Sequence, residues 1–174
     1  MTAALSSRST KKAPQLALRL GALPDCAIDW CDGVGIVYLG RELRVRLGTA
    51  HTVAALEGEN LHLPLPPEAS ARQIQDSAEA WLRQQCVAYV ETLFAQNQNR
   101  QLVLVTRRSP QVLLSFAARA PWISVDDANT VRCNWRLIAQ APQTIAQHAD
   151  KALRQLSALR QTNTTVDMFG ALPA

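Results

Sequence analysis

The features that the sequence lacks exclude several classes of protein. No run of about 18 apolar residues occurs, so a membrane-spanning helix is not expected. The first residues, MTAALSSRSTKKAP (1–14), contain no apolar stretch of roughly 7 to 15 residues and therefore do not resemble a secretory leader. We expect this segment to form a flexible basic tail. The chain is accordingly expected to be cytoplasmic and to bind no membrane.

Two further absences concern cofactors and redox chemistry. The four cysteines form no C-x-x-C pair, so we expect free thiols in a reduced cytosolic chain. Cys86 and Cys133 fall in apolar stretches, where a cysteine is typically a small core residue. No glycine-rich phosphate loop occurs, because GVG (33–35) has the character of a turn before a strand. No cofactor is expected.

The composition is that of one globular domain. The chain has 174 residues, of which 48% are apolar and 18% charged, which is enough for a real core. The formal net charge of +4 permits contact with DNA or RNA, although many proteins this basic bind neither.

Alternation with a period of two predicts strands in the first half of the chain. Leu43 and Val45 alternate with polar residues, which indicates one buried and one wet face. Because Pro64 lacks an amide hydrogen, we expect the strand around it to lie at a sheet edge. The strand stretches are GIVYLG (35–40), RELRVRL (41–47) and LHLPL (61–65), with EGEN (57–60) as a turn.

Apolar residues at spacings of three and four predict a long helix from about Ala71 to about Gln96. Ser70 is suited to be its N-cap. The expected buried stripe consists of Ile74, Ala78, Trp81, Leu82, Cys86, Val90, Leu93 and Phe94. The opposite, wet face is expected to carry Arg72, Gln75, Asp76, Glu79, Arg83 and Gln84.

Further strands and a last helix complete the predicted architecture. Pro142 suits the first turn of a helix, where its missing amide hydrogen costs nothing. Strands, a long helix, strands and a second helix predict an α+β domain with antiparallel strands over residues 15–160. The later strands are QLVLV (101–105), QVLLSF (111–116) and TVRCNWRLI (130–138). The buried stripe of the last helix is expected to consist of Ile145, Ala149, Ala152, Leu153, Leu156 and Leu159.

Three stretches are distinctive: YLGRELRVRLG (38–48), LHLPLPPEASARQIQDSAEAWLRQQ (61–85) and NWRLIAQAP (134–142). Together they resemble the YgjP-like metal-dependent hydrolases, which are relatives of the SprT and zincin peptidases. The resemblance covers roughly residues 33–156 and implies a zincin-like last helix. Members typically carry a tryptophan-glycine-serine motif before the final strand, and this chain has Trp122, Ile123 and Ser124 there.

The chemistry that the resemblance implies requires H-E-x-x-H on the last helix. Two histidines one turn apart bind zinc, and the glutamate activates the metal-bound water. Counted from Pro142, the histidine positions fall on Ala152 and Leu156, and the glutamate position falls on Leu153. A further family ligand downstream is also missing. The resemblance therefore implies a hydrolase scaffold without its metal centre, with no catalytic and no metal-binding residues.

The remaining histidines offer no obvious substitute. His148 and Asp150 are two residues apart, so they point in different directions on a helix. His62 alternates away from the apolar residues beside it, which indicates solvent, and His51 also lies in the strand region. A rebuilt zinc site is not expected.

The last residues (161–174) are interpreted as a flexible tail. The stretch TVDMFG (165–170) is similar to the short motifs with which bacterial DNA polymerases and repair proteins dock on the sliding clamp. Those motifs commonly begin with glutamine, and Thr165 stands here instead. Large apolar residues on a polar tail typically insert into a pocket, either of a partner or of their own domain. The candidate partner-binding residues are Val166, Asp167, Met168 and Phe169.

Three functions stay open from the sequence. The first is a catalytically inactive metallohydrolase-like protein that acts as an interaction module, with the sliding clamp as the candidate protein partner. The second is an active metal-dependent hydrolase or peptidase with other ligands. The third is a nucleic-acid-binding protein. Its candidate contacts are Arg41, Arg44, Arg46, Arg107 and Arg108.

Overall fold

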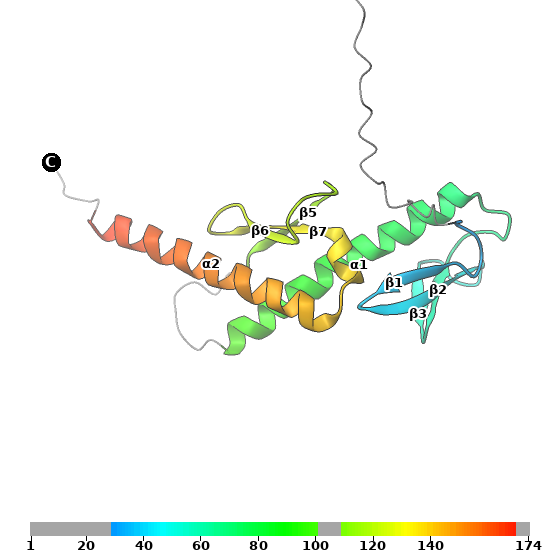
Figure 1. Ribbon diagram of the computed structural model, residues 1–174, viewed down its shortest axis with the longest axis horizontal. Helices are drawn as coiled ribbons and strands as arrows, with labels where there is room; N and C mark the ends of the chain where they lie inside the picture. The colour runs from blue at the N-terminus through cyan, green and yellow to red at the C-terminus, as the bar shows by residue number, and fades with distance from the viewer. Residues whose placement is uncertain (1–28, 101–108, 170–174) are drawn as a thin grey trace, which may run out of the picture.

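The computed structural model of the protein describes residues 29–100 and 109–169 (Figure 1). The side chains of residues 98–100 and 163–169 are outside this description, as are the expected strand at 101–105 and the tail at 1–14. The elements are β1 (Gly35–Tyr38), β2 (Arg41–Leu47), β3 (Ala55–Glu57), β4 (Asn60–Leu63), α1 (Ala71–Arg100), β5 (Gln111–Ser115), β6 (Ile123–Val125), β7 (Thr130–Asn134), the 3-10 helix η1 (Trp135–Ala139) and α2 (Pro142–Phe169). This order confirms the predicted α+β class.

The first sheet has the strand order β1-β2-β4-β3. β1 and β2 form the expected antiparallel hairpin, and Leu43 and Val45 of β2 are buried while Arg44 and Arg46 are exposed. β4 pairs with β2 in parallel and with β3 in antiparallel orientation, so it is an interior strand. The prediction of an edge position was wrong, because β4 ends at Leu63, one residue before Pro64. The short strand β3, which the alternation pattern missed, forms the edge of the sheet beside β4.

The second sheet has the order β5-β7-β6. β5 pairs with β7 in parallel, and β6 pairs with β7 in antiparallel orientation. Each sheet thus contains one parallel pair, which corrects the expectation of purely antiparallel strands. The stretch 130–138, expected to be one strand, leaves the sheet at Asn134 and continues as η1.

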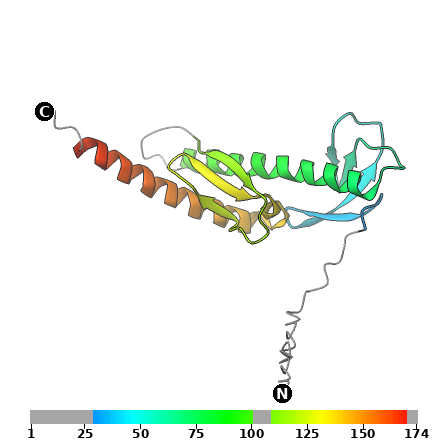
Figure 2. The ribbon, with the colours of Figure 1, turned by 90° about the horizontal axis from the view of Figure 1, so that it is seen from above.

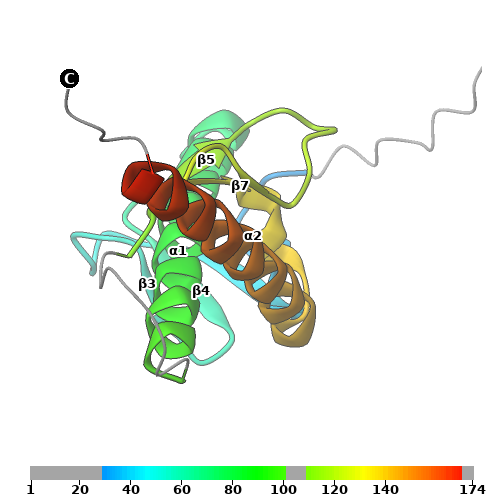
Figure 3. The same ribbon diagram turned by 90° about the vertical axis from the view of Figure 1, so that its left-hand side faces the viewer.

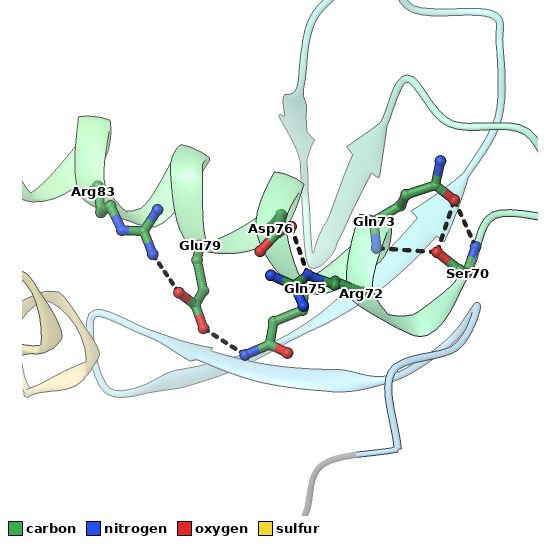
Figure 4. Close-up of polar contacts among 7 residues, drawn as sticks. All are labelled: Ser70, Arg72, Gln73, Gln75, Asp76, Glu79 and Arg83. Carbon is green, nitrogen blue, oxygen red and sulfur yellow. Dashed lines mark hydrogen bonds and ion pairs between the residues drawn. The ribbon is translucent and has the colours of Figure 1, made fainter.

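A capping box begins α1, as the prediction of Ser70 as N-cap requires. The Ser70 Oγ accepts a hydrogen bond from the Gln73 amide at 3.4 Å, and the Gln73 Oε1 accepts one from the Ser70 amide at 2.9 Å (Figure 4). The helix runs four residues beyond its expected end and stops at Arg100. Its predicted apolar stripe is buried, except that Leu93 is half-buried.

α1 joins the two sheets into one core. Figures 1 and 2 show the first sheet beside the N-terminal half of α1, with the second sheet and α2 beside its C-terminal half.

Cys86 of α1 and Cys133 of β7 are buried free thiols whose sulfur atoms lie 3.6 Å apart, as expected of core residues. Their hydrogen bond, together with burial, raises the pKa of Cys133, so this thiol stays protonated.

The turn of the first hairpin is bound to the segment that precedes α2. Leu39 (φ 50°) and Gly40 (φ 73°) both have positive φ, as in a two-residue type I′ turn. The Leu39 amide donates to the Ile138 carbonyl at 2.7 Å, and the Gly40 amide donates to the Ala139 carbonyl at 3.2 Å. Two of the three stretches that carry the family resemblance are therefore in direct contact.

α2 is longer than the sequence pattern indicated. It continues to Phe169, so residues 161–169 are helical, whereas an extended tail was expected (Figure 3). Residues 160–165 are all polar, so the sequence offered no apolar stripe that would have predicted this extension. None of the helices, within the residues described, is long and apolar enough to cross a membrane.

Candidate functional site

The three positions of α2 that the resemblance links to zinc chemistry lie in the core. Ala152, Leu153 and Leu156 are 2%, 8% and 1% exposed. Lys151, Arg154 and Gln155 alternate with them and face solvent. No imidazole, carboxylate or thiol occurs in the sequence from Lys151 to Val166. This part of α2 therefore offers no metal ligand, in whatever register it is compared with H-E-x-x-H.

His148 and Asp150 belong to no group of three potential metal ligands among the described residues. The Asp150 Oδ1 accepts a hydrogen bond from the Asn97 Nδ2 at 2.7 Å, which links α2 to α1. His148 is half-buried and lies between the core positions Ile145 and Ala149 of the helix.

A different group of potential ligands gathers on the outer face of the first sheet. His62 lies in β4, Glu57 in β3, and His51 in the segment between β2 and β3. The His51 Nε2 is 3.7 Å from the Glu57 Oε1, and the His62 Nε2 is 3.7 Å from the Glu57 Oε2. The two imidazole centroids are 5.0 Å apart. One ligand atom from each of the three residues falls within 4.8 Å of the others, and no other such group occurs in the described ranges 29–100 and 109–169.

Hairpin register brings two of these residues together. Glu57 pairs with Asn60 and His62 pairs with Ala55, so Glu57 and His62 are diagonal neighbours on one face. The expectation that His62 faces solvent alone was incomplete, because β3 was not predicted. The turn at EGEN was the available signal: a hairpin closed there would have placed Glu57 beside His62.

The polar residues of α1 are less exposed than their pattern suggested. Gln75, Glu79 and Arg83 were expected on a wet face, but all three are half-buried. Gln75 donates to Glu79 at 2.8 Å, and Glu79 accepts a second bond from the Arg83 Nη2 (Figure 4). The Arg83 guanidinium lies 5.3 Å from the Trp135 ring centroid and 5.5 Å from that of Phe116. Arg83 therefore belongs to a cluster of aromatic and guanidinium groups, in which cation–π attraction holds the side chain against the domain.

The arginines predicted to contact nucleic acid are not gathered on one face. Arg44 and Arg46 share the exposed face of β2 with Glu42, whereas Arg41 follows the same alternation as the buried Leu43. Arg46 is also 3.9 Å from the Asp32 carboxylate. Arg107 and Arg108 lie outside the described residues. Contact with nucleic acid stays a prediction.

The predicted docking residues lie at the end of α2. The backbone of residues 166–169 forms its last turn, and the side chains of Val166, Asp167, Met168 and Phe169 are outside the described part of the chain. Docking through them stays a prediction. Closer to the core, the Arg160 Nε donates to the Ala128 carbonyl at 2.7 Å, which fixes α2 to the loop before β7.

Comparison with known proteins gives one match. A family model described as YgjP-like, metallopeptidase domain, matches residues 10–148. The matched residues cover most of the chain and end before Ala152, the first of the three core positions of α2. Neither a curated protein nor a solved structure matches the chain.

Proposed function

Because the chain belongs to the YgjP-like family of metallopeptidase domains, we propose that it uses this scaffold as a binding module and has no hydrolase centre on α2. A fold hosts many functions, so the residues at the site decide which one is present. Two features of this scaffold lie in stretches that carry the family resemblance: the hairpin turn is bound to the segment before α2, and Asn134 at the end of β7 is buried.

One observation carries this proposal: the burial of Ala152, Leu153 and Leu156 in the apolar core. A catalytic zinc centre needs three protein ligands and a fourth position open to water or substrate. Aliphatic side chains provide no ligand, and a packed helix face leaves no open position beside them. The helix face that the family resemblance links to zinc chemistry is here buried in the core, which supports the proposal.

A hydrolysis assay tests the loss of catalysis. We expect the purified protein not to cleave an unfolded protein such as casein above the protein-free rate, with or without added Zn²⁺. An active zinc peptidase assayed in parallel is the positive control. Cleavage that EDTA abolishes and Zn²⁺ restores would contradict the proposal.

For the partner, we propose that the segment around residues 165–170 docks on the bacterial sliding clamp. The support is the sequence TVDMFG, with two adjacent large apolar residues at the end of a polar stretch. Residues up to Phe169 are helical, so insertion into a groove as an extended peptide requires the last turns of α2 to unwind. Residues of modest or low helix propensity, Thr162, Asn163, Thr164, Thr165 and Val166, reduce the cost of unwinding.

Truncation after Gln161 tests this docking proposal. The shortened chain keeps the contact of Arg160 with Ala128, so we expect its melting temperature to stay nearly unchanged while clamp binding is lost. In a peptide of residues 162–174 titrated against the clamp, Phe169→Ala should cost at least about 2 kcal/mol of binding free energy, as for an apolar anchor in a pocket.

Thr164→Ala in the same peptide is the matched control and should bind like the original sequence. A fall in melting temperature by several degrees on truncation would instead place the segment in the fold. An unchanged affinity of the Phe169→Ala peptide would equally refute docking through this residue.

A further inference from the structure

We infer that His51, Glu57 and His62 bind one divalent transition-metal cation, with Zn²⁺ as the best match, on the outer face of the first sheet. This site is separate from α2 and uses none of the positions that the family resemblance links to zinc. Two of the three histidines in the whole sequence belong to it.

The distances fit metal ligands better than hydrogen bonds. Both Nε2-to-carboxylate separations are 3.7 Å, which is longer than a hydrogen bond between a nitrogen and an oxygen. Zn²⁺ binds imidazole nitrogen and carboxylate oxygen at about 2.0 to 2.2 Å, so ligand atoms on a tetrahedral ion lie about 3.4 Å from each other. The two pairs that involve Glu57 are therefore already close to the spacing of a bound ion, and all three ligand atoms, which lie within 4.8 Å of one another, must draw closer to bind it.

The donor set also selects the class of cation. Two imidazoles and one carboxylate suit Zn²⁺ and its neighbours in the first transition row, whereas Mg²⁺ and Ca²⁺ prefer oxygen ligands alone. With neutral imidazoles the ligands carry one negative charge in total, from Glu57. The side chains of His51, His62 and Glu57 are 32%, 29% and 62% exposed, so an ion can enter from solvent and keep a water as its fourth ligand.

The arginine beside the site, Arg46, already contacts other polar side chains. Arg46 of β2 pairs with His62 across the parallel strands. Its Nη1 lies 3.9 Å from the Asp32 carboxylate, and its Nε donates to the Asn60 Oδ1 at 3.4 Å. The Asp32 carboxylate offsets part of the positive charge that would otherwise oppose a cation beside His62.

A bound ion would join segments that the sheet alone leaves separate. Glu57 and His62 belong to the hairpin of β3 and β4, and His51 belongs to the connection that follows β2. Ligation of all three would fix this connection to the edge of the sheet. Because metal binds the folded form, added Zn²⁺ should raise the melting temperature.

Titration with Zn²⁺ alone, in competition with a chromogenic chelator, tests the site. We expect one equivalent per chain for the original protein. His51→Ala, His62→Ala and Glu57→Gln should each weaken binding by at least about tenfold, since the first two remove an imidazole ligand and the third replaces the charged carboxylate by a neutral amide. The same variants should lose the rise in melting temperature that Zn²⁺ causes.

His148→Ala and Glu59→Gln are the matched controls, one a histidine of α2 and the other a glutamate in the turn beside Glu57. Both should bind like the original protein. Equal affinity of the original protein and the His51→Ala variant would overturn the inference, and so would a loss of binding in His148→Ala. His51 lies outside the strands, so its replacement leaves the hydrogen bonds of the sheet in place.

Discussion

Introduction of an H-E-x-x-H motif on α2, by Ala152→His, Leu153→Glu and Leu156→His together, is expected to unfold the domain and to give no activity. All three positions lie in the core. Loss of a buried leucine side chain to alanine already costs about 2 to 5 kcal/mol, and a buried charge or imidazole without partners adds to that. A domain is typically stable by only about 5 to 15 kcal/mol, so the triple change removes most or all of this stability.

Urea denaturation followed by circular dichroism measures this effect, with Leu156→Ala as the mildest single change. Arg154→Glu with Gln155→His is the matched control, because both positions lie on the exposed face of the same turn. The urea midpoint of the control should stay within roughly a few tenths M of that of the original protein, as for an ordinary surface substitution. An unchanged midpoint in the triple variant would show that this face of α2 is open to solvent, and would make it a candidate ligand site.

Replacement of Asn134 by alanine is expected to have the next largest effect on stability. Asn134 is 1% exposed and caps η1, where its Oδ1 accepts from the Arg136 amide at 3.1 Å. Its Nδ2 donates to the Ala117 carbonyl at 3.2 Å and lies 3.5 Å from that of Ala120. Each buried group left without a partner costs about 1 to 3 kcal/mol, so Asn134→Ala should lower the free energy of unfolding by at least about 2 kcal/mol.

Asn129→Ala, at an exposed position in the loop before β7, is the matched control and should change stability little. Thermal and urea unfolding of the two variants give the comparison. Equal stabilities of the two variants would mean that water replaces the hydrogen bonds of Asn134. The cap would then contribute little to the free energy of unfolding.

Periodic segments were predictable because one physical cause fixed each of them. The spacing of Ile74, Ala78 and Trp81 indicated α1, and the alternation around Val45 indicated β2. Each pattern arises from burial of one face of the element, so the spacing of apolar residues within the element indicates it. The cap of α1 was predictable for the same reason, since Ser70 and Gln73 satisfy each other within four residues.

Features that depend on distant partners were not predictable. The parallel pairing of β2 with β4 requires a connection whose path no local pattern records. Arg83 was assigned to the wet face, because only the folded chain brings Trp135 and Phe116 to its guanidinium.

The candidate metal site was not predictable for a similar reason, because no local pattern indicates that its three residues come together. His51 lies in a connection without periodicity, and the short strand β3 that carries Glu57 has too few residues for an alternation pattern. Most of the buried face of α2 was predictable, by contrast, because Ala152 and Leu156 belong to a regular apolar stripe. Leu159 was wrongly included in that stripe, since it is 42% exposed.

The contact between the first hairpin and η1 has a consequence for the order in which the chain folds. The amides of Leu39 and Gly40 obtain their acceptors from Ile138 and Ala139, which are synthesised about a hundred residues later. Closing so long a loop costs entropy before any contact offsets it, so such distant pairings slow folding. A nascent chain that ends within α1 can form the hairpin but cannot dock its turn. The domain therefore becomes complete only when the segment leading into α2 has left the ribosome, and until then the turn of the first hairpin lacks its partner and the core is incomplete.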